Sequence, residues 1–198
     1  MGIMEVIKIV ISPYGLLIIS ALMLVIGRFL FKKKHLNCFD IIKNNFKCFK
    51  ASNGKISKIS IFLYFIIPFL ISMSLVQIRE LDDTVVNILT IIVSILTSMF
   101  FTLLIFILDM YKRVKYDKNY TASEALVSTK ILEETYYSIM FEILVSVVIL
   151  IMCFIELFAK SYYYFSSILI YYLTFVMLTN MFMILKKVYK VIDKDLKM

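Results

Sequence analysis

Two polar side chains lie inside stretches of sequence that are otherwise apolar. Glu142 lies about one helical turn from the start of "SIMFEILVSVVILIMCFIELF", and Asn180 about a turn and a half from the end of "YYYFSSILIYYLTFVMLTNMFMIL". Polar groups at membrane depth are rare and often mark an ion or proton site. The alternative is a carboxylate that is hydrated near the membrane surface or paired with a lysine. No second deep carboxylate or histidine accompanies Glu142, so a proton relay is not predicted.

A row of hydroxyl groups is the second feature. Thr90, Ser94, Ser98 and Thr102 recur at every fourth position of "NILTIIVSILTSMFFTLLIFILD". Steps of four residues advance about 400° around a helix, so the four hydroxyls drift by only about 120° and share one slanted face. Lipid tails gain nothing from hydroxyls, whereas small residues let two helices approach closely and hydrogen-bond. We predict a packing seam; a pore lining and an accident of composition are the alternatives.

Metal and catalytic chemistry find little support in the residue pattern. His35, Cys38 and Cys48 do not have the spacing of a zinc site and lack a fourth ligand. Together with Cys153 the cysteines are expected to be free thiols. The chain has one histidine and no Gly-rich phosphate loop or Ser/His/Asp set. The sequence therefore predicts a protein that is not an enzyme and needs no metal or cofactor.

The elements that must position these residues are long apolar blocks. Hydrophobic residues make up 62% of the 198 residues and charged ones 18%, with a mean hydropathy of +0.91. Blocks of about 20 apolar residues are long enough to cross a bilayer as helices. We predict an all-α membrane bundle of about five spans, at 9–31, 59–78, 86–108, 138–158 and 162–185. The short connection at 159–161 leaves open that the last two form one kinked helix, giving four.

The basic residues predict the orientation of the spans. Of the 22 Lys and Arg residues, 19 lie at the inner end of the first span, in the loops 32–58 and 109–137, or in the tail 186–198. Positively charged loops stay in the cytoplasm. The amino terminus is therefore expected outside and the carboxyl terminus in the cytoplasm. We expect a multi-pass protein of a bacterial inner membrane, and the heavy use of Lys, Asn and Ile is typical of an AT-rich genome. Glu156 and Asp109, near span boundaries, are expected to reach water.

The first loop predicts an amphipathic helix at the inner membrane surface. Its apolar residues recur at intervals of three and four between lysines: Leu36, Phe39, Ile42, Phe46 and Phe49. Such a helix lies flat among the headgroups, with its lysines toward anionic lipid. The positive-inside bias explains the net charge of +8 without a polyanionic partner, so no nucleic acid is expected.

The second loop predicts a helix that runs into a membrane span. Thr121 and Glu124 form a capping-box pattern, and no Gly or Pro follows before the end of 138–158. The helix should start near Ala122 and project about four turns into the cytoplasm. Its modest apolar side needs a partner or a neighbouring subunit to cover it; the residues are Ala125, Leu126, Thr129, Leu132 and Tyr136.

The order of "IIPFLISMSLVQI", "NILTIIVSILTSMFFTLLIFILDM" and "LEETYYSIMFEILVSVVILI" resembles small multi-span membrane proteins of bacterial anti-phage defence operons, such as the membrane subunit of Kiwa-type systems. The resemblance is one of arrangement and has no diagnostic motif; a fifth span departs from the four that several such proteins have. It implies a homo-oligomeric component of a defence or stress system that couples membrane state to a cytoplasmic protein partner. The alternatives are an accessory subunit of a transporter or export system and a small channel.

Overall fold

The computed structural model describes residues 38–48, 62–116, 122–158 and 163–195. All regular structure among them is helical, and no strand occurs in these ranges, so the all-α prediction is confirmed for the part described. The helices are α3 (Phe39–Cys48), the π-helical turn η2 (Phe62–Ile66), α5 (Ile67–Ile78), α6 (Asp83–Tyr116), α7 (Ala122–Glu156) and α8 (Tyr164–Asp195). The predicted span 9–31 lies outside the described residues. Residues 40–198 form one compact unit.

Three helices are long and apolar enough to cross a membrane, which suggests a membrane protein. They are Asp83–Tyr116, Leu126–Glu156 and Tyr164–Asp193, and Phe62–Ile78 is a shorter apolar helix. Each of these four helices overlaps one of the predicted spans. At 1.5 Å per residue the three long helices each measure roughly 45–50 Å, more than the hydrocarbon layer of about 30 Å. The connection predicted at 109–137 is therefore mostly helix, and the start of α7 at Ala122 agrees with the prediction.

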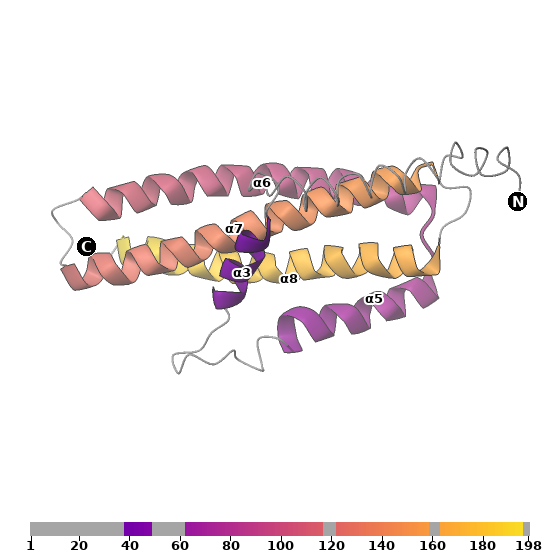
Figure 1. Ribbon diagram of the computed structural model, residues 1–198, viewed down its shortest axis with the longest axis horizontal. Helices are drawn as coiled ribbons and strands as arrows, with labels where there is room; N and C mark the ends of the chain where they lie inside the picture. The colour runs from indigo at the N-terminus through magenta and orange to yellow at the C-terminus, as the bar shows by residue number, and fades with distance from the viewer. Residues whose placement is uncertain (1–37, 49–61, 117–121, 159–162, 196–198) are drawn as a thin grey trace, which may run out of the picture. The chain divides into compact units, whose positions relative to one another are not determined.

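The helices pack in the spatial order α6, α7, α8, α5, with α7 between α6 and α8 (Figure 1). Neighbouring helices run in opposite directions. Near one end of the α7–α8 pair Ser166 contacts Glu156, and near the other Lys187 contacts Glu134. The two helices are therefore a hairpin and not one kinked helix.

The buried positions repeat every seven residues along each long helix. In α6 they are Val86, Val93, Phe100, Ile107 and Val114; in α8 they include Ile170, Met177, Ile184 and Val191. In α7 two such rows are buried: Ser128, Thr135, Glu142, Ile149 and Glu156, and beside them Leu132, Ile139, Ser146 and Cys153. A seven-residue repeat is typical of helices that pack nearly antiparallel in a bundle.

Pro68 explains the irregular start of the α5 segment. Proline has no amide hydrogen, and its ring clashes with the carbonyl group four residues earlier, here that of Tyr64. The wider turn η2 covers Phe62–Ile66, and α5 begins at Ile67 with proline in its first turn. Within the predicted span 59–78, the described residues 62–78 thus form a helix with a π-turn in front of its proline.

The turn between α5 and α6 is fixed by Asp82. Its carboxylate accepts the amide N–H of Val85 at 2.7 Å, which caps α6, and a hydrogen bond from the Arg79 guanidinium at 2.9 Å. The hydroxyl of Tyr171 donates to the carbonyl of Arg79 at 3.4 Å, so α8 holds the same turn. The hydrogen bond from Arg79 lowers the pKa of Asp82, and the same contact raises the pKa of Arg79.

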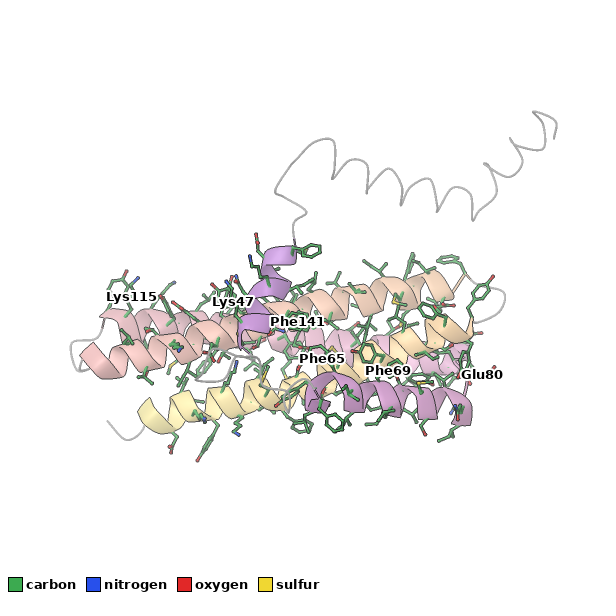
Figure 2. The ribbon with its side chains drawn as sticks, turned by 60° about the horizontal axis from the view of Figure 1, so that its bottom comes forward. Lys47, Phe65, Phe69, Glu80, Lys115 and Phe141 are labelled. Atoms are coloured by element: carbon green, nitrogen blue, oxygen red, sulfur yellow. The ribbon has the colours of Figure 1, made fainter. Side chains whose placement is uncertain are left out.

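Charge separates the two ends of the bundle. Lys115, at the end of α6, and Glu80, in the α5–α6 turn, lie at opposite ends (Figure 2). We call the end with Lys115 and the last turns of α8 the basic end, and the end with the α5–α6 turn the acidic end. This separation is what the predicted topology requires; the orientation in a membrane stays a prediction.

Candidate functional site

Glu142 and Asn180 come together inside the α7–α8 interface. Glu142 is 1% exposed and Asn180 is fully buried. The amide side chain of Asn180 faces the carboxyl group of Glu142. The two residues were singled out separately in the sequence, and antiparallel packing of α7 on α8 makes them a pair.

The pair lacks the hydrogen bonds that buried polar atoms normally have. Oε2 of Glu142 and both Nδ2 and Oδ1 of Asn180 have no hydrogen-bond partner among the described residues. Buried polar side-chain atoms in native proteins are mostly hydrogen-bonded, and each exception needs an explanation. The cost is high at membrane depth, where no bulk water is available.

Two serine hydroxyl groups lie on either side of Glu142 along α7, but they donate their hydrogens to backbone carbonyl groups of α7 and not to the pair. Ser138 donates to the carbonyl of Glu134 at 2.9 Å, and Ser146 donates to that of Ile143 at 2.8 Å. These serines lie one turn before and one turn after Glu142 on α7, and both are buried. Because the hydrogens point at their own helix, the serine oxygens can still accept hydrogen bonds.

A cation lies one turn from Glu142 toward the basic end, but it has another partner. The ammonium nitrogen of Lys187 is 3.7 Å from the carboxylate of Glu134 and 3.4 Å from the hydroxyl oxygen of Ser138. Helix α3 meets α7 at the same level, where the Cys48 thiol donates to the carbonyl of Glu134 at 3.6 Å. Burial raises the pKa of Cys48. Among the described residues, Lys187 therefore pairs with Glu134 and not with Glu142.

Glu156 differs from the prediction. We expected it to reach water, but it is 5% exposed and accepts a hydrogen bond from the Ser166 hydroxyl, while its Oε2 has no partner among the described residues. The first turn of α8 packs over the last turn of α7 and covers the carboxyl group. Asp109, the other boundary residue, is exposed as expected.

The predicted packing seam lies mostly on the outer face of α6. Thr90 is partly buried and contacts the Cys153 thiol of α7, whereas Ser94, Ser98 and Thr102 are exposed. Any close packing of those three must involve a helix outside the described residues or a second copy, so the seam stays a prediction.

The small polar residues that do pack inside the bundle were missed. They are spaced by seven residues: Ser128 and Thr135 precede Glu142 in the same row of α7, and Ser167 and Thr174 lie on α8.

Helix α3 presents two of the predicted aromatic side chains outward. Phe39 is 63% and Phe46 37% exposed, while Ile42 is partly buried. The ring of Phe46 stacks on that of Phe65 at 5.6 Å. The fully buried residue of α3 is Asn45, which was not expected from the sequence. Leu36 and Phe49 lie outside the described residues, and contact with anionic lipid stays a prediction.

A groove of about 240 Å³ lies where α6 and α7 approach the basic end. It is lined by Ile107, Leu108, Tyr111, Leu132, Glu133, Tyr136 and Tyr137. The hydroxyl of Tyr111 donates to the carboxylate of Glu133 at 3.3 Å across it. Of the predicted apolar side of α7, Leu132 is buried and Leu126 is 70% exposed. The projecting part of α7 is thus covered in part by the chain's own α6.

No group of three or more His, Cys, Asp or Glu side chains that could hold a metal ion occurs in the described residues.

Comparison of the chain with protein-family models, with curated proteins and with solved structures gives no match. The resemblance to membrane subunits of defence systems therefore stays a prediction.

Proposed function

We propose that the protein is a membrane component that transmits changes in its membrane-spanning part to a cytoplasmic protein partner. The observation that carries the proposal is the continuity of α6, α7 and α8. Each runs as one helix from an apolar segment into a charged extension at the basic end. Because the buried faces interlock every seven residues, a shift of one helix in the membrane displaces its extension as well.

The groove at the basic end is the surface that suits a protein partner. Its walls carry three tyrosines, which combine a large apolar ring with a hydroxyl group, the kind of side chain enriched in the centre of protein interfaces. The neighbouring surface adds the exposed side chain of Leu126. A partner segment with apolar anchors and a basic residue opposite Glu133 would fit this combination.

The cellular setting is proposed from the sequence. The charge distribution supports a multi-pass protein of a bacterial inner membrane with its basic end in the cytoplasm. The resemblance in span arrangement supports an oligomeric, non-enzymatic role in a defence or stress system. An accessory subunit of a transporter would have the same topology. A small channel is the second candidate because polar residues line one side of α7, but these residues are buried inside the bundle.

Site-specific photo-crosslinking tests the proposal. A photoreactive amino acid replaces Tyr136 in the groove or, as the control, Ile95, which is 63% exposed on the apolar face of α6. In cells expressing the full chain with its native neighbouring genes, we expect a discrete protein adduct from position 136 and none of that mass from position 95. Identical adducts from both positions, or none from 136, would contradict a cytoplasmic partner. Ion flux through liposomes containing the purified chain alone would favour the channel instead.

A further inference from the structure

We propose that Glu142 and Asn180 form a proton-binding site within the α7–α8 interface, and that the site exchanges its proton with the basic end of the bundle. The proposal is independent of the cytoplasmic partner. It starts from the buried atoms that lack hydrogen-bond partners, since they belong to two side chains of complementary chemistry that face each other.

A protonated glutamate accounts for all three of the unpartnered atoms. A neutral carboxylic acid and a carboxamide can form two hydrogen bonds at once, O–H to the amide oxygen and N–H to the acid carbonyl. These bonds use the acid oxygens of Glu142 together with Nδ2 and Oδ1 of Asn180. A carboxylate could accept only the N–H, and Oδ1 of Asn180 would keep no donor.

A proton fits the site better than a metal ion. Even with the oxygens of Ser138 and Ser146, the carboxyl group and one amide oxygen offer fewer ligands than the roughly six to eight oxygens that a hard cation such as Ca²⁺ takes. The described ammonium group closest along the interface, Lys187, pairs with Glu134. A proton needs no cavity and no further ligand.

The arrangement of polar groups gives the site one open side. Toward the basic end, Ser138 lies one turn from Glu142 on α7 and is in contact with Lys187. Lys187 in turn contacts Glu134, and the side chains of Lys187 and Glu134 are 15% and 35% exposed. Toward the acidic end, Ser146 is followed by Ile149, which is fully buried, and on α8 Val176 and Met177 are at most 2% exposed. This apolar layer separates the pair from Glu156.

The remaining titratable groups facing this region lie on three helices. They are Glu134, Cys153 and Glu156 on α7, Lys187 on α8, and Cys48 on α3. On α6 the titratable residues lie near its two ends: Asp83 is in the first turn, at the acidic end, and the others begin at Asp109, toward the basic end, beyond the buried Ile107. Loss of the proton would leave a buried negative charge between α7 and α8, so the packed hairpin loosens or admits water when the cytoplasmic pH rises.

Infrared spectroscopy of the full chain in lipid nanodiscs tests the proposal. A protonated carboxyl group has a carbonyl stretch separate from the amide and carboxylate bands. A glutamate in free contact with water would be protonated in about one chain in 500 at pH 7. We expect close to one protonated carboxyl per chain at pH 7, a band lost in Glu142→Gln, and a shifted band in Asn180→Leu, which removes the hydrogen-bond partner.

The matched control is Asp109→Asn, which removes an exposed carboxylate and should leave the band unchanged. The wild-type spectrum alone is decisive if a variant does not fold: absence of a protonated carboxyl at pH 7 overturns the proposal, as does a band whose intensity is unchanged in Glu142→Gln. An ionised Glu142 paired with a lysine from another part of the chain would give the first of these results.

Discussion

Phe100 and Phe101 provide a test of how the bundle is held together. They are adjacent on α6 and at nearly the same membrane depth, yet Phe100 is fully buried against the other helices and Phe101 is 50% exposed. In lipid the apolar surroundings of an unpacked helix are as favourable to a ring as the protein interior, so burial from water contributes little. The difference between Phe100→Ala and Phe101→Ala therefore measures packing alone.

The expected magnitude follows from the volume that is lost. Truncating phenylalanine to alanine removes about 100 Å³, and an uncollapsed cavity costs about 24 cal/mol per Å³, which gives an upper value of about 2.4 kcal/mol for Phe100→Ala. The exposed ring of Phe101 leaves no cavity, and its removal should change the free energy of unfolding by no more than about 0.5 kcal/mol.

Unfolding titrations in mixed micelles, followed by circular dichroism, would measure both variants against the parent chain. A loss of about 1–2.4 kcal/mol for Phe100→Ala, allowing for partial collapse, together with a near-silent Phe101→Ala agrees with the seven-residue packing pattern. Equal losses for the two variants would refute it, because the rotational position of α6 would then be wrong.

Three further predictions concern α6 and its ends. The double variant Ser94→Leu with Ser98→Leu should abolish any oligomer on native gels while leaving the monomer folded. The corresponding alanine double variant keeps the close approach of the helices and should assemble normally. Monomers from both double variants would argue against side-chain size as the cause, and unchanged assembly of the leucine variant would contradict the packing seam. In cells, Asp82→Cys should react with an impermeant thiol reagent from outside and Lys115→Cys should not, and the reverse pattern would invert the predicted topology. The pKa of Asp82 is lowered in the folded chain, so its contacts with Arg79 and the α6 amide stabilise the fold above the ordinary carboxyl pKa. This stabilisation is lost as the pH falls through the lower folded pKa. Asp82→Asn should therefore reduce the destabilisation by acid, measured by unfolding at pH 2 to 6, and an unchanged acid profile would contradict this expectation.

The sequence by itself determined the helical class, the position of the long apolar helices and the start of α7. These properties follow from local composition: about 20 apolar residues must be helical in lipid because every backbone group needs an internal partner. The absence of Gly and Pro after Ala122 predicted one uninterrupted helix, and the structure has one to Glu156. Glu142 and Asn180 were identified as unusual for the same reason, since polarity at membrane depth is visible in one segment at a time.

Only the tertiary structure decided which faces of these helices meet. No face of an apolar helix in lipid contacts water, so hydrophobicity does not distinguish the face buried against other helices from the face that contacts lipid. For that reason the hydroxyl row of α6 attracted attention although Ser94 and Ser98 are exposed, and Ser128 and Thr135, which do pack inside the bundle, were overlooked. The pairing of Glu142 with Asn180 has the same origin: it depends on the antiparallel alignment of α7 and α8, which contacts such as Lys187 with Glu134 reveal and neither segment encodes alone.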